Sequence, residues 1–169
     1  QSEDCYGNEF QSSKNCFDCY YMMNAEDCAY CDNGKEQKDC RYVMNWMKNL
    51  SNSYCCQTVG INSSQLAFTI NSTDNHSELY YCSNVFFGIT HSFGCIGLHN
   101  HEHHCILNTA YSVQEYESNA MRLIDHMKNT GEWWQFFPRS ASPFEYNESL
   151  AGELFPLSER EATYQGWNW

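Results

Sequence analysis

The segment Asn15-Cys16-Phe17-Asp18-Cys19 recurs at intervals of 12 or 13 residues as far as Leu98. A fixed short period predicts a solenoid, in which each repeat forms one turn stacked on the next. At about 3.3 Å per residue, such a turn has a contour of roughly 40 Å and encloses only a narrow interior. The other repeats begin at Asp27, Asp39, Asn52, Gln65, Glu78 and His91.

Small or apolar residues, most of them cysteine, occupy the second and fifth positions of each repeat. Two positions three residues apart cannot share a face of one straight strand, so a corner must lie between them if both point inward. Stacked cysteines about 5 Å apart would accept disulfides, whereas reduced thiols would pack there as small hydrophobes. The sequence leaves both states open. The cysteines in these columns are Cys16, Cys19, Cys28, Cys31, Cys40, Cys56, Cys82 and Cys95.

Other columns indicate corners and an outer aromatic face. A hydrogen-bonding side chain opens every repeat, which suits a bend whose backbone groups are satisfied by side chains. A second column is rich in Asn and ends in Gly, the residues that best tolerate left-handed backbone angles. It comprises Tyr21, Asn33, Asn45, Thr58, Asn71, Asn84 and Gly97. The aromatic residues predicted to stack in ladders include Phe17, Tyr30, Tyr42, Tyr54, Phe68, Tyr80, Tyr81 and Phe93.

Beyond Leu98 the period ends, and the sequence favours one more strand at 105–107 followed by helices. Ser112 and Glu115 form a capping box, an apolar stripe at helical spacing follows, and Gly131 suits a C-cap. These features predict a helix over 112–131. Shorter helices are expected over about 147–154 and from a second capping box at Ser158.

The predicted fold is mainly β, a narrow parallel β-solenoid with 12–13-residue turns followed by a small helical, aromatic C-terminal cap. Residues 1–14 are expected to form an irregular N-terminal turn or cap, 15–111 the solenoid, and 112–169 the helical cap. The end of a solenoid leaves a strand edge and an apolar cross-section uncovered. The aromatic C-terminal region is the expected cover.

Composition limits the choice of partners and compartment. The net charge of -12, with nine Lys and Arg in 169 residues, disfavours nucleic acid and anionic membranes and suits a basic protein partner. No run of about 18 apolar residues predicts a membrane span. Eleven cysteines favour an extracellular or cell-surface location, and the start at Gln1 is consistent with signal-peptide removal, other processing or a piece of a longer product. The candidate glycosylation sites are Asn49, Asn62, Asn71, Asn75 and Asn147.

Two clusters carry metal-ligand chemistry. Alternation of His99, His101 and His103, with His104 beside them, would place imidazoles on one face of an extended strand, where they could hold zinc or copper. The paired CxxC motifs of the first two repeats resemble a four-cysteine zinc site. Their spacing equals the structural repeat, however, so a structural role is the preferred interpretation.

Three sets of residues point to a known family: the Asn-Cys-aromatic-x-Cys units, the segments Ser92-Phe93-Gly94-Cys95-Ile96-Gly97-Leu98 and Cys105-Ile106-Leu107-Asn108, and the C-terminal motifs. They resemble an uncharacterised family of Cys-, Asn- and Tyr-rich repeat proteins from uncultured bacteria. Those C-terminal motifs are Thr130-Gly131-Glu132-Trp133, Phe136-Phe137-Pro138, Ser142-Pro143-Phe144, Tyr146-Asn147-Glu148 and Phe155-Pro156-Leu157. The resemblance implies no activity or ligand. Zinc-ribbon-like cysteines that precede the repeat in such proteins are lacking here, so a metal role does not carry over.

No nucleophile motif or phosphate-binding glycine loop is present, so catalysis is not expected. The leading hypothesis is a structural or interaction solenoid that assembles with copies of itself into an extracellular filament or oligomer. A metal- or redox-binding module built on the Cys columns and the His patch is the first alternative. A carbohydrate-binding or carbohydrate-active β-helix is the second, by analogy of fold alone.

Overall fold

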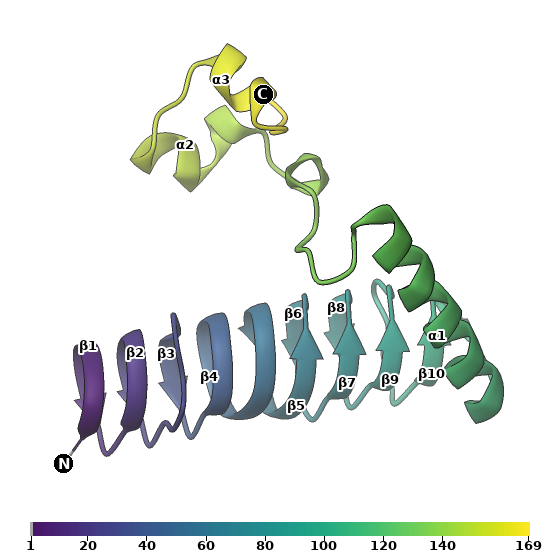
Figure 1. Cartoon of the computed structure of the whole chain (residues 1–169), viewed down its shortest axis with the longest axis horizontal. Helices are drawn as coiled ribbons and strands as arrows, with labels where there is room; N and C mark the ends of the chain where they lie inside the picture. The colour runs from purple at the N-terminus through teal and green to yellow at the C-terminus, as the bar shows by residue number, and fades with distance from the viewer. Residues whose placement is uncertain (1) are drawn as a thin grey trace. The chain divides into compact units, whose positions relative to one another are not determined.

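The computed structural model describes residues 2–169, except for the side chains of Asn45 and Trp46. The predicted corner residue Asn45 therefore lies outside the described side chains. The first part of the chain is a parallel β-solenoid of about eight turns, and its strands stack in a row from β1 to β10 (Figure 1). The strands are β1 (Glu3–Gln11), β2 (Lys14–Met23), β3 (Asp32–Lys35), β4 (Lys38–Val59), β5 (Ile61–Ala67), β6 (Ile70–Thr73), β7 (Ser77–Tyr80), β8 (Ser83–Phe86), β9 (Thr90–Phe93), β10 (His103–Ile106) and β11 (Thr109–Ala110).

Each regular turn is built from units of three residues. In β2 every third side chain is buried and the two between are exposed. The residue that precedes each inward position has a left-handed backbone, with φ of 52° at Asn15, 47° at Asp18 and 53° at Tyr21. Non-glycine residues seldom adopt this region, so its repetition every third residue bends the strand into a four-cornered coil. The predicted corner between the two cysteine columns is confirmed as one of these bends.

Backbone hydrogen bonds join each turn to both neighbours. Phe17 N donates to Cys28 O of the next turn at 2.9 Å, and Tyr30 N donates back to Phe17 O at 2.9 Å. The register places Leu66 beside Leu79 and Leu79 beside Ser92. Equivalent residues of successive repeats therefore lie one above another, as the sequence alignment predicts.

Four columns of side chains fill the interior. They are Ser13, Ala25, Gln37, Leu50, Ser63, His76 and Ile89; Cys16, Cys28, Cys40, Ser53, Leu66, Leu79, Ser92 and Cys105; Cys19, Cys31, Val43, Cys56, Thr69, Cys82 and Cys95; and Met22, Gly34, Met47, Val59, Ser72, Val85 and Leu98. The sequence revealed two of these columns. The interior is narrow enough that most members are small, and in the fourth column Met22 and Met47 are separated by glycine.

Asparagine ladders run along two of the outer corners. Asn49 Nδ2 donates to Asn62 Oδ1 at 2.7 Å, and Asn62 Nδ2 donates to Asn75 Oδ1 at 3.2 Å. On another corner Asn71 Nδ2 donates to Asn84 Oδ1 at 3.2 Å. These residues both accept the left-handed backbone and bond to their equivalents in the next turn.

The last turn is closed by a reversal of the chain. β11 pairs antiparallel with β10, joining Cys105 to Ala110 and Ile106 to Thr109. Helix α1 (Val113–Thr130) then packs on β10, and its Tyr116 joins Phe93 and Ile106 in a small apolar cluster. The predicted capping box at Ser112 and the C-cap at Gly131 are both present.

The chain divides into two compact units, the second of which is Phe136–Trp169. The expected helical cap over 112–169 thus spans both units: α1 and the following tryptophans belong to the first, and residues 136–169 form the second. In that unit Tyr146 N bonds to Asn168 O and Arg139 lies 5.3 Å from the Trp167 ring centroid. It contains η1 (Arg139–Ala141), η2 (Tyr146–Glu148), α2 (Leu150–Leu154) and α3 (Glu159–Tyr164).

Candidate functional site

The inward cysteines share one hydrogen-bonding role with the inward serines and threonine. Cys40 Sγ donates to Lys38 O, two residues earlier, at 3.2 Å, and lies 3.6 Å from Leu50 O of the next turn. A hydroxyl can make the same contacts, so the three residue types are interchangeable in this interior. The contact with the carbonyl two residues earlier recurs at Ser13, Cys16, Cys19, Cys28, Cys31, Ser53, Cys56, Ser63, Thr69, Cys82, Ser92, Cys95 and Cys105.

All eleven cysteines are free thiols. Burial raises the pKa of Cys56 to about 12. In the cluster formed by the first three repeats, contacts with neighbouring thiols followed by burial raise the pKa of Cys16, whereas contacts with other thiols lower the pKa of Cys19 and Cys28. The titrations of these thiols are therefore coupled, because the proton affinity of each depends on whether its neighbours are protonated. At 0–2 % exposure they offer no accessible nucleophile.

The four histidines of the candidate metal patch make contacts of different kinds, and the rings of His103 and His104 lie edge to face with centroids 6.4 Å apart. His103 Nδ1 lies 2.8 Å from Thr90 Oγ1, and His104 stacks on His91 with ring centroids 4.9 Å apart. His99 stacks on the Phe86 ring, while His101 occupies a left-handed corner. Within the described part of the chain, no group of three or more His, Cys, Asp or Glu side chains is placed to hold a metal ion.

His76 and Gln37 are buried polar residues in the first interior column. Ile89 N donates to His76 Nδ1 at 3.1 Å, which leaves Nε2 buried without a partner. Burial lowers the pKa of His76 and so disfavours its charged form. Both amide atoms of Gln37 are likewise buried and unpartnered.

The predicted aromatic ladder is present on the outer face. Ring contacts connect successive turns, and Tyr30 stacks on Tyr42 with centroids 4.8 Å apart. Two tryptophans that follow α1 extend the ladder: Trp134 lies parallel to Tyr54, with centroids 5.4 Å apart, and Trp133 stacks on Phe93. The further contacts are Tyr6–Phe17, Phe17–Tyr30, Tyr42–Tyr54, Tyr54–Phe68, Phe68–Tyr81 and Tyr81–Phe93.

Tyr81 fixes the tryptophan segment on this face. Its hydroxyl accepts from Trp134 N at 2.9 Å and donates to Glu132 O at 3.4 Å. Trp134 itself has a left-handed φ of 67° and remains 47 % exposed. Trp134 therefore forms a wall: its backbone is held in place by Tyr81, and its ring is exposed to solvent.

A hollow of about 220 Å³ lies beside this wall. Its aromatic side is made by Tyr54, Tyr80 and Trp134, and Ala67 contributes to its lining. Its polar side is made by Asp39, Arg41, Asn52 and Gln65. We call this the Trp134 hollow; it combines an apolar surface with a carboxylate, a guanidinium and two amides.

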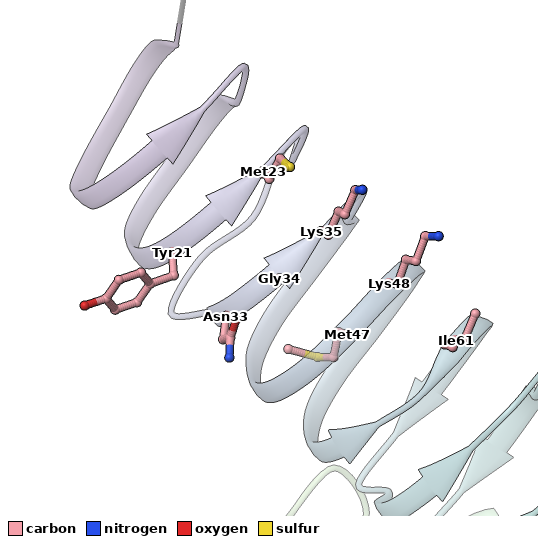
Figure 2. A pocket seen from close by; sticks show the side chains of 8 residues that line it. All are labelled: Tyr21, Met23, Asn33, Gly34, Lys35, Met47, Lys48 and Ile61. Atoms are coloured by element: carbon pink, nitrogen blue, oxygen red, sulfur yellow. The ribbon is translucent and has the colours of Figure 1, made fainter.

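A second depression, of about 390 Å³, lies over β2 to β5. Figure 2 shows Met23, Lys35, Lys48 and Ile61 in a row, one from each successive turn. Lys35 pairs with Glu36 at 3.9 Å, and its side chain is 47 % exposed. Lys35 and Lys48 are both exposed at this depression, which therefore forms a weaker candidate than the Trp134 hollow.

The candidate glycosylation sites lie mainly in the asparagine ladders. Asn49 and Asn62 use their amide Nδ2, the atom that would carry a glycan, to bond to the next turn. Because stacked turns are about 4.8 Å apart, glycans on Asn49, Asn62 and Asn75 would also crowd one another. Asn71 is in the second ladder, and Asn147 lies in η2.

Searches of protein-family models, of curated proteins and of solved structures each gave no match. The resemblance to the repeat family therefore stays a prediction. None of the helices in the described residues is long and apolar enough to cross a membrane.

Sequence reasoning missed the Trp134 hollow because its wall comes from a segment 80 residues after Tyr54 in the chain. The repeat alignment did contain one indication of it. Ala67 stands in the same outward column as Tyr54 and Tyr80, and a small residue between two large ones predicts a gap in a ladder.

Proposed function

We propose that the protein is a structural β-solenoid that associates with copies of itself through the outer edge of β1, outside the cell or at its surface. The observation that carries the proposal is the difference between the two ends. In the described strands β1 pairs with β2 alone, whereas β10 is covered by β11. An open strand edge is a template for another strand.

The cross-section at β1 supports the same proposal. Cys5 and Phe10 are only partly buried, although their equivalents in the next turn, Cys16 and Met22, are 0 % and 1 % exposed. A second copy laid against β1 would cover this apolar surface. The gain would be about 25 cal/mol for each Å² of apolar area removed from water.

The charges of β1 make this association dependent on ionic strength. Glu3, Asp4 and Glu9 are exposed on the edge strand, so two identical edges repel each other. Salt screens such repulsion. Self-association should therefore strengthen as ionic strength rises, whereas binding of a basic partner should weaken.

Sedimentation velocity over a range of protein and salt concentrations tests the proposal. The charge-reversed variant Glu3→Lys/Glu9→Lys should pair with the wild-type chain at low salt more tightly than either chain pairs with itself. Glu117→Lys/Asp125→Lys, on exposed positions of α1, is the matched control and should not have this effect. A strict monomer at high protein and salt concentration, or equal behaviour of the two variants, would contradict the proposal.

A further inference from the structure

We infer that the Trp134 hollow binds a neutral saccharide through one of its rings. This inference goes beyond self-association and uses a different surface. The hollow arises where a small residue stands between two tyrosines. Tyr54, Ala67 and Tyr80 are consecutive members of one outward column, so the two tyrosines stand two turns apart, about 9.6 Å. Alanine leaves more room between them than a third large side chain would, and at 3 % exposure it forms the floor of the hollow.

Trp134 completes the apolar side of the hollow. Its ring lies at 13° to Tyr54 and at 88° to Phe68, and the Tyr81 hydroxyl holds its backbone N–H at 2.9 Å. The ring is therefore oriented before any ligand arrives, which reduces the ordering entropy of binding. Aromatic faces carry negative charge and attract the polarised C–H groups on the flat face of a sugar ring.

The polar side is a ladder, three consecutive members of which stand beside the hollow without a partner among the described residues. In this corner column Asn15 Nδ2 bonds to Asp27 at 2.9 Å, and Glu78 lies 3.3 Å from His91. The three residues between them, Asp39, Asn52 and Gln65, make no side-chain hydrogen bond or ion pair to another of the described residues. They are exposed and stand on successive turns.

These groups match the edge of a sugar. A carboxylate and two amides supply acceptors and donors at intervals of about 4.8 Å, and Arg41 adds a fork of donors. Asp39 and Arg41 cancel in charge, and the chain carries -12 overall, so an anionic ligand such as a nucleotide or uronic acid is disfavoured.

The size of the hollow selects among the neutral ligands that stack on aromatic residues. Its volume of about 220 Å³ is below the roughly 300–1,000 Å³ typical of sites for drug-sized molecules. A single saccharide ring fits this description, with the rest of a chain lying outside. A proline-rich peptide needs an extended aromatic groove, which makes it the less suitable occupant.

Saturation-transfer NMR followed by calorimetry tests the inference with four neutral probes: cellotetraose, chitotetraose, mannotetraose and maltotetraose. At least one should bind the wild-type protein. Gln65→Ala and Asp39→Asn should each weaken that binding, on the order of tenfold for one lost hydrogen bond. Ala67→Leu should abolish it by filling the hollow. Gln57→Ala, which alters an exposed glutamine outside the hollow, should leave it unchanged.

Circular dichroism should show the same fold for all four variants, so that loss of binding reports on the hollow. The inference is overturned if none of the probes binds at about 10 mM, where even millimolar sites are occupied. It is also overturned if binding is insensitive to Gln65→Ala and Ala67→Leu. Binding of a PxxP peptide, but of no saccharide, with the same sensitivity would replace the saccharide with a peptide ligand.

Discussion

Gly34 and Gln37 are expected to be energetically coupled, because the side chain of one occupies the space that the other leaves empty. A Cβ added at Gly34 would lie 2.7 Å from Gln37 Oε1 and closer still to Nε2. Gln37 is 1 % exposed, so its amide has little room to move away. Overpacking of this kind typically destabilises by about 1–3 kcal/mol, and Gly34→Ala should lower the free energy of unfolding by that amount.

Gln37→Ala should behave differently. It removes a methylene worth about 0.8 kcal/mol of burial, but it also removes two buried polar atoms that lack partners, each of which costs about 1–3 kcal/mol. We therefore expect the variant to be at least as stable as the wild-type protein. In Gly34→Ala/Gln37→Ala the clash is absent, so the double variant should recover about 1–3 kcal/mol relative to Gly34→Ala.

Urea unfolding followed by circular dichroism measures all three variants. Gly60→Ala is the matched control, since its Cβ would lie 2.7 Å from the Thr73 backbone and should not be rescued by Gln37→Ala. Additive effects of Gly34→Ala and Gln37→Ala would refute the argument. A loss well above about 1 kcal/mol in Gln37→Ala alone would mean that the amide has a partner, such as ordered water.

Three further predictions concern the interior and the aromatic face. Cys40→Ser should change the free energy of unfolding by less than about 1 kcal/mol, because a hydroxyl can keep both carbonyl contacts, whereas Cys40→Ala should cost about 1–2 kcal/mol; urea unfolding distinguishes them. Tyr81→Phe should lose the bond to Trp134 N, cost about 1 kcal/mol, and increase proteolysis after α1. Burial lowers the pKa of His76 below its unfolded value, so the unfolded chain binds the proton more readily and stability should fall as pH drops through about 6.5. The dependence of the urea midpoint on pH should be weaker in His76→Leu, and an unchanged dependence would contradict this assignment.

The stacking direction and the aromatic ladder could be predicted because both follow from the period. Once repeats of 12 or 13 residues are aligned, Phe17 and Tyr30 must occupy neighbouring turns whatever the details of the coil. The helix after the solenoid was also predictable, since Ser112 and Glu115 satisfy local backbone groups with no help from tertiary contacts. These features depend on sequence spacing alone.

The full set of corners could not be predicted, because many corner residues are of types that do not favour a left-handed backbone. Asn33 and Asn71 tolerate a left-handed backbone, but Tyr30, Cys55 and Phe68 occupy the same kind of position and normally avoid it. They are held there by stacking and backbone pairing across turns. The tertiary structure thus overrides a local preference, and a pattern of residue types cannot reveal that.

Large and small side chains are combined within single turns of the narrow interior. The turn containing Leu66 has serine or threonine at its other three inward positions, Ser63, Thr69 and Ser72. The turn of Ala25, Cys28, Cys31 and Gly34 is the least filled, and the long side chain of Gln37 enters from the next turn against that glycine. Cysteine is common here because it is small, apolar and able to donate to a nearby carbonyl. Its abundance therefore follows from the cross-section of the coil, and functional chemistry should be sought on the outer faces and at the β1 edge.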